Sequence, residues 1–141
     1  MSDTNPTMDG LFGEVVYSYT REQALADGVL VDVSKMASEA GFNFPIAVTQ
    51  RLYAEVLTPD PRAEGQSIEG RLWDALFMLH MAIAGQIPSK TTEGPGPGQT
   101  TLYQCYFIMK KRQRRLLTLK AVCGPGDNME PVITIMTEFE D

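Results

Sequence analysis

The clearest alternation of hydrophobic and polar residues lies near the C-terminus, in two β-prone runs separated by a short turn. In residues 116–123 apolar side chains alternate with polar ones, so one face of a strand is apolar. That face carries Leu117, Leu119, Ala121 and Cys123. Residues 131–136 are rich in β-branched side chains, and the sequence between the runs is Gly-Pro-Gly-Asp-Asn followed by Met-Glu. The pattern predicts a β-hairpin.

A further strand and a long helix complete the centre of the predicted fold. Residues 102–110 have apolar and aromatic side chains on both faces of a strand, which is typical of a central position. Residues 68–84 repeat apolar side chains at three- and four-residue spacing, which predicts a helix that covers the sheet. The predicted stripe is Leu72, Trp73, Leu76, Phe77, His80 and Ile83. We expect the apolar face of the three C-terminal strands to pack beneath this helix.

The N-terminal half predicts shorter elements. Residues 1–10 are polar and acidic and are expected to form a flexible tail. Residues 11–19 predict a strand from their aromatic and β-branched content. Thr20 and Gln23 have the spacing of a capping box, which predicts a short helix.

Ser34 is expected to cap a further short helix that ends at Gly41, and Thr49 to cap the helix at residues 50–57. Residues 87–99 are interpreted as a loop because Gly and Pro alternate at their centre. Residues 11–141 then form a single α+β domain. Its antiparallel sheet has a C-terminal three-stranded meander packed against one long helix and smaller N-terminal helices.

Length and composition fit one globular domain. The chain has 141 residues, of which 43% are hydrophobic and 21% charged. No apolar run approaches the ~20 residues of a membrane helix, and the N-terminus lacks the apolar core of a secretory signal. We expect a cytoplasmic protein that does not associate with membranes.

Residue types that commonly carry chemistry are few. Cys105 and Cys123 share no CxxC spacing and lie in apolar strand patterns, which indicates two buried free thiols. His80 is the single histidine, and its place on the helix stripe is that of a core or partly buried residue. This set does not predict a zinc site, although a metal held by carboxylates alone stays open. We expect no cofactor and assign no catalytic residue.

Charge is distributed unevenly. The net charge is −6, and residues 1–70 hold eleven acidic and four basic side chains. An acidic protein is repelled by bulk nucleic acid and by anionic membranes. The exception is a basic run at an expected hairpin tip: Lys110, Lys111, Arg112, Arg114 and Arg115. The run either grips phosphates, with Tyr103 and Tyr106 nearby in sequence, or is a solvated turn that prevents strand aggregation.

A second set of candidates consists of polar and aromatic side chains that would line a pocket. These residues are Tyr17, Tyr19, Arg21 and His80. The alternative is that the tyrosines pack with their hydroxyl groups reaching water or backbone. Nothing in their spacing selects a catalytic geometry.

Four segments together resemble one family of small bacterial proteins, found in chromosomes, plasmids and phage and known only as a domain of unknown function. They are residues 11–21 (LFGEVVYSYTR), 26–33 (ADGVLVDV), 70–74 (GRLWD) and 119–127 (LKAVCGPGD). The similarity spans roughly residues 11–141. It transfers no catalytic residue, and it implies a mobile-element context.

Three hypotheses about function follow. The first is a non-enzymatic accessory protein of a mobile element that contacts a host or mobile-element protein, for instance against a defence system. The second is a nucleic-acid-binding module that uses the basic run at 110–115. The third is a small enzyme acting on a nucleotide, with the pocket candidates at its site. A flat apolar sheet face would in addition favour a dimer.

Overall fold

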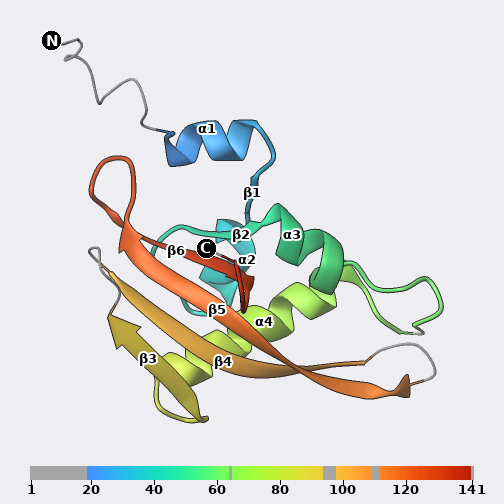
Figure 1. Ribbon diagram of the computed structural model, residues 1–141. Helices are drawn as coiled ribbons and strands as arrows, with labels where there is room; N and C mark the ends of the chain where they lie inside the picture. The colour runs from blue at the N-terminus through green and yellow to red at the C-terminus, as the bar shows by residue number, and fades with distance from the viewer. Residues whose placement is uncertain (1–18, 64, 94–97, 109–111, 141) are drawn as a thin grey trace, which may run out of the picture.

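The computed structural model describes residues 19–63, 65–93, 98–108 and 112–140, which form one six-stranded sheet with helices packed on it (Figure 1). The helices are α1 (Arg21–Ala26), α2 (Ser34–Glu39), α3 (Gln50–Leu52), the π-helix η3 (Tyr53–Leu57) that continues α3, and α4 (Ile68–Ile83). The strands are β1 (Leu30–Asp32), β2 (Ile46–Thr49), β3 (Ser89–Glu93), β4 (Gln99–Ile108), β5 (Arg114–Pro125) and β6 (Pro131–Thr137).

The strands lie in the order β1-β2-β6-β5-β4-β3. Strands β4, β5 and β6 form the predicted antiparallel meander, and the predicted α+β class is confirmed. The sheet is not wholly antiparallel, however, because β2 pairs in parallel with β6, with Ile46 opposite Ile133. Parallel neighbours need a long connection between them, so no local pattern in the sequence reports this pairing.

One face of the sheet, which we call the inner face, packs against α2, α4 and η3 in a single core. Inner-face side chains such as Ile135, Leu119 and Phe107 are almost fully buried there, together with Leu76 and Leu79 of α4. At roughly 1.5–3 kcal/mol for each fully buried aliphatic side chain, this layer is the main source of stability.

The predicted extent of the long helix is confirmed. Its predicted buried stripe is correct in part: Leu72 and Leu76 are buried, whereas Trp73, Phe77 and Ile83 are exposed. Trp73 and Phe77 are 38% and 43% exposed, and their rings stack on each other with centroids 6.3 Å apart. The core positions of α4 are Arg71, Leu72, Ala75, Leu76, Leu79 and Ala82. Small Ala side chains let the helix approach the sheet closely, and the large aromatic rings lie on the side away from it.

The helix caps predicted at Thr20 and Thr49 are present in the structure. Thr20 and Gln23 form the predicted capping box at the start of α1. Thr49 accepts a hydrogen bond from the Leu52 amide, as expected for the cap of α3. The same helix ends in a π-helical turn, because the amide of Thr58 donates to the Tyr53 carbonyl, 2.9 Å away.

The loop predicted at 87–99 is partly a strand, and the predictions for residues 1–19 fall almost entirely outside the described residues. The predicted loop at 87–99 is wrong in part, since Ser89–Glu93 forms β3 and pairs with Gln99–Tyr103. Its sequence is polar throughout, so an edge strand of this kind leaves no hydrophobic alternation to detect. The tail predicted at 1–10 and the strand predicted at 11–19 lie outside the described residues, apart from Tyr19.

Candidate interaction surface on the β4–β5 ribbon

Strands β4 and β5 extend beyond their neighbours in the sheet. Strand β3 pairs with β4 only as far as Tyr103, and β6 pairs with β5 only from Leu119 onward. The remaining residues, 104–108 and 114–118, pair only with each other in the described part of the chain. We call this two-stranded projection the distal ribbon; it runs toward the right of Figure 1.

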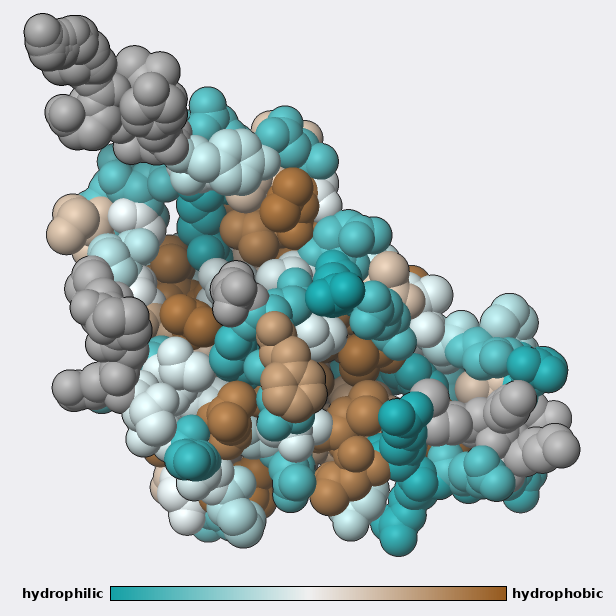
Figure 2. All heavy atoms as spheres, in the orientation of Figure 1, coloured by the Kyte–Doolittle hydropathy of each residue, from teal (hydrophilic) through white to brown (hydrophobic). Residues whose placement is uncertain are grey.

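The face of the distal ribbon that turns away from α4 exposes large apolar side chains. Tyr106 and Leu116 lie opposite each other, and they are 54% and 42% exposed; Ile108 is 37% exposed. The guanidinium carbon of Arg114 lies 5.0 Å from the centroid of the Tyr106 ring, within the range of a cation–π contact. Figure 2 shows hydrophobic side chains reaching the surface over β4 and β5 between hydrophilic ones.

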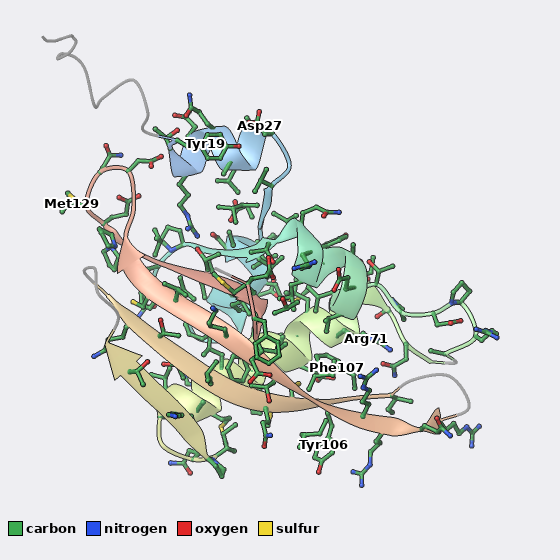
Figure 3. All side chains as sticks on the ribbon, in the orientation of Figure 1. Tyr19, Asp27, Arg71, Tyr106, Phe107 and Met129 are labelled. Carbon is green, nitrogen blue, oxygen red and sulfur yellow. The ribbon has the colours of Figure 1, made fainter. Side chains whose placement is uncertain are left out.

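The other face of the distal ribbon is held by a buried arginine. Arg71 of α4 donates to the carbonyls of Ile108 and Val56, at 2.6 and 2.7 Å. Its guanidinium carbon also lies 5.6 Å from the Phe107 ring centroid, and burial lowers its pKa. Figure 3 shows Tyr106 and Phe107 on opposite sides of β4, with Arg71 beside Phe107. Arg71 therefore ties the outer end of the β4 segment of the ribbon to α4 and η3.

Exposed arginines gather at the outer end of the ribbon. Arg112, Arg114 and Arg115 are exposed, and no ion pair involves them among the described residues. By contrast, Arg51 pairs with Glu55 and Arg62 with Asp60, each at 3.1 Å. Lys110 and Lys111, which complete the predicted basic run, lie outside the described residues. The ribbon is thus a cationic, partly apolar projection on an acidic body.

The predicted pocket residues lie in separate places. The Tyr19 hydroxyl donates to the Asp27 carboxylate at 2.7 Å, which raises the pKa of Tyr19. His80 is partly buried, as expected, with its ring edge-on to Phe42 at 5.5 Å between centroids. Tyr17 lies outside the described residues. Arg21 lines a cavity beside Asp127 and Val132, and neither Tyr19 nor His80 lines that cavity.

Arg21 joins the first helix to the C-terminal hairpin. Its guanidinium donates to the Thr134 hydroxyl at 2.7 Å and to the Ile133 carbonyl at 2.9 Å, and burial lowers its pKa. In return, the Asp127 carboxylate accepts from the backbone amides of Arg21 and Glu22, which holds the pKa of Asp127 below its usual value. These contacts give Arg21 and Asp127 a structural role in docking α1.

Groups with nucleophilic or metal-binding chemistry do not assemble into a site in the described residues. Burial raises the pKa of Cys105 to about 12, so its thiol stays protonated, while Cys123 is a free, half-buried thiol. The Tyr103 hydroxyl donates to the Ala75 carbonyl at 2.9 Å. Nowhere in the described ranges do three or more His, Cys, Asp or Glu side chains lie close enough to share a metal ion.

Comparison with protein-family models, with curated proteins and with solved structures finds no match to this chain. The resemblance of the four sequence segments therefore remains an expectation. The described helices include none with the length and apolar character required to cross a membrane.

Sequence reasoning located the cations of the ribbon but missed its apolar surface and its anchor. The alternation of Cys105 and Phe107 with Tyr106 and Ile108 does separate two faces. It does not reveal that neighbouring strands end before Tyr106 is covered. The burial of Arg71 could not be predicted from the sequence, because a charged residue on an amphipathic helix is normally assigned to the solvent side.

Proposed function

We propose that this protein is a non-enzymatic binding module whose contact surface is the outer face of the distal ribbon. Its partner is a protein that presents an acidic segment with apolar side chains. Such an activity suits an accessory protein in the mobile-element context that the sequence resemblance implies, with a host or mobile-element protein as partner.

The observation that carries the proposal is the grouping of Tyr106, Leu116 and Arg114 on one exposed face. Tyrosine and arginine are enriched at protein interfaces, and they often provide a large share of binding energy. An exposed apolar group between cations on a projecting ribbon favours a partner with the opposite charge.

A second candidate is nucleic-acid binding, favoured by five basic residues within the run at 110–115. Two features weigh against it. The net charge of −6 opposes approach to a polyanion, and Arg114 already lies over the Tyr106 ring, where a base would stack. Aliphatic side chains such as Leu116 and Ile108 also contribute more to a protein interface than to phosphate binding.

Binding of two probes to the full-length protein tests the proposal by isothermal calorimetry. The first probe is an acetylated peptide that alternates glutamate with valine and isoleucine, and the second is single-stranded oligothymidine. We expect the peptide to bind, and we expect the Tyr106→Ser/Leu116→Ser variant to bind it at least ~10-fold more weakly, the loss of about 1.4 kcal/mol typical of a contact residue.

A matched control is Tyr19→Ser, which removes a similarly exposed tyrosine far from the ribbon in sequence and in the fold. This variant should bind the glutamate peptide as the wild type does. Tight oligothymidine binding that weakens steeply with salt, with no peptide binding, would establish the second candidate instead. Equal peptide affinity in wild type and the Tyr106→Ser/Leu116→Ser variant would refute the proposed surface.

A further inference from the structure

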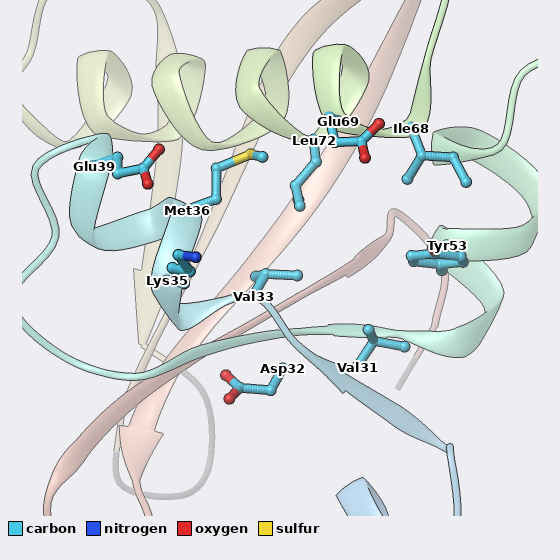
Figure 4. A pocket seen from close by; sticks show the side chains of 10 residues that line it. All are labelled: Val31, Asp32, Val33, Lys35, Met36, Glu39, Tyr53, Ile68, Glu69 and Leu72. Atoms are coloured by element: carbon cyan, nitrogen blue, oxygen red, sulfur yellow. The ribbon is translucent and has the colours of Figure 1, made fainter.

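A separate cavity of about 670 Å³ opens between β1, α2, η3 and the first turns of α4 (Figure 4). Apolar side chains from all four elements line it: Val31, Val33, Met36, Tyr53, Ile68 and Leu72. All six belong to the hydrophobic core or pack against it. The cavity is therefore a place where the core itself is accessible from outside, and it shares no lining residue with the distal ribbon.

The charged residues around this cavity are mostly acidic. Asp32, Glu39 and Glu69 line it together with one cation, Lys35. In the part of the chain that the structure describes, none of these four side chains makes an ion pair. The surplus of two carboxylates favours a ligand that is apolar in its centre and positively charged around it.

The cavity adjoins a free sheet edge. Strand β1 pairs only with β2 among the described strands. The amide of Val33 donates to the Ile46 carbonyl, and the carbonyl of Val29 accepts from the Gln50 amide. Because backbone groups alternate along a strand, those of Leu30 and Asp32 point away from β2, toward the free edge.

An added strand would place a side chain in the cavity. Residues opposite each other on neighbouring strands share a face of the sheet, so the residue opposite Val31 would lie beside Val31, on the cavity side. Backbone bonds to Leu30 and Asp32 would then give affinity, and the cavity and its carboxylates would give specificity. A small free molecule would make the contacts in the cavity but not the backbone hydrogen bonds to β1.

We propose that this cavity and the β1 edge bind an extended basic segment of a partner protein. An apolar side chain is inserted beside Val31, and the Lys or Arg side chains two residues before and after it, on the same face of the added strand, face Glu39 and Glu69. This site differs from the proposed contact surface on the ribbon in position and in the sign of its charge. It stands independently of that proposal.

The test titrates the full-length protein with an acetylated lysine peptide whose central sequence is Lys-Thr-Val-Thr-Lys, so that Val and both Lys side chains share one face of the strand, followed by NMR. We expect the Met36 methyl resonance to shift and exchange of the Leu30 amide to slow, because that amide gains a hydrogen-bond partner. The same peptide with both lysines replaced by glutamate is the charge-reversed control, and it should leave both signals unchanged.

Variants of the carboxylates then test specificity. Glu39→Gln/Glu69→Gln should weaken binding of the lysine peptide about tenfold at low salt, a typical sum for two partly exposed charge contacts. The matched control, Glu22→Gln/Glu55→Gln, removes the same charge outside the cavity and should change the affinity by less than about twofold.

Several results would overturn the inference. They are no binding of the lysine peptide, equal weakening by both double variants, or resonance changes confined to residues away from Val31 and Met36. Sedimentation without peptide identifies a second copy as the occupant if Glu39→Gln/Glu69→Gln abolishes self-association. If the lysine peptide does not bind the cavity but the peptide that alternates glutamate with valine and isoleucine still binds the ribbon, this inference is wrong and the proposed function is retained.

Discussion

Replacement of Arg71 by Met should destabilise the protein and loosen the outer end of the distal ribbon. The variant keeps a side chain of similar length but removes the donors to the carbonyls of Val56 and Ile108. Each of these partly buried carbonyls, once left without a donor, costs about 1–3 kcal/mol. Removal of a desolvated cation offsets part of this loss. We therefore expect the free energy of unfolding to fall by about 2–4 kcal/mol.

Urea unfolding followed by circular dichroism measures this change. Arg71→Lys, which keeps the charge but cannot reach both carbonyls with a planar fork, should lose roughly half as much. Arg51→Met is the matched control, because Arg51 makes only an exposed pair with Glu55 and should lose less than about 0.5 kcal/mol. Hydrogen exchange should accelerate in residues 104–108 of the Arg71→Met variant before it does so in β6. A loss below about 1 kcal/mol for Arg71→Met would refute the assigned role of Arg71 as the anchor of the ribbon.

Three further predictions address the hairpin turn, the core and the phase of α4. The folded state holds the pKa of the Asp127 carboxyl below its usual value of about 4. The charged carboxylate therefore stabilises the fold above about pH 4, and this stabilisation is lost as the pH falls through the lower pKa of the folded state. The stability difference between wild type and Asp127→Asn should accordingly shrink below about pH 4, as measured by thermal unfolding; a constant difference would contradict this. The Cys105 thiol, with a pKa of about 12, should react with iodoacetamide at pH 8 only after unfolding, which mass spectrometry of labelled peptides detects. Leu76→Ala should lower the free energy of unfolding by about 2–5 kcal/mol, and Trp73→Ala should lower it by less than about 1.5 kcal/mol, because Leu76 is buried and Trp73 is partly exposed. A larger loss for Trp73→Ala than for Leu76→Ala would contradict the orientation of α4.

The sequence was most informative where a structural feature depends on neighbouring residues. The β5–β6 hairpin follows from the alternation at 116–123 and the turn after it, and both strands are longer than that pattern alone indicates. The capping box of α1 is likewise a local signal. The parallel pairing of β2 with β6 joins residues more than eighty positions apart, and neither strand carries a mark of the other.

The phase of α4 illustrates a different limit. Hydrophobicity alone places Trp73 and Phe77 in the buried stripe, because both are large and apolar. Close packing of a helix on a sheet instead selects small residues at the contact, and Ala75 and Ala82 are fully or nearly fully buried. Attention to those alanines would have shifted the stripe toward Arg71, which lies four residues before Ala75 and on the same side of the helix.

The candidate ribbon surface was predictable only in its charge. A run of five basic residues between two strands marks a hairpin tip whatever the rest of the fold. Exposure of Tyr106 depends on how far β3 and β6 extend beside the ribbon, and β3 was not predicted as a strand. The lengths of neighbouring strands therefore decide whether a buried face or a binding face results.

The two proposed surfaces also bear on whether the protein forms a dimer. A twofold dimer needs a patch that complements itself, since the same residues meet on both copies. The ribbon would then set cations such as Arg114 and Arg115 against each other, and the cavity would set Glu39 against Glu69. Like charges at the centre of an interface disfavour association. Opposite charges would meet only if the ribbon of one copy bound the cavity of another. Such a contact is not twofold, and it produces open chains of copies unless the chain closes into a ring. Charge therefore disfavours a twofold dimer formed through either surface.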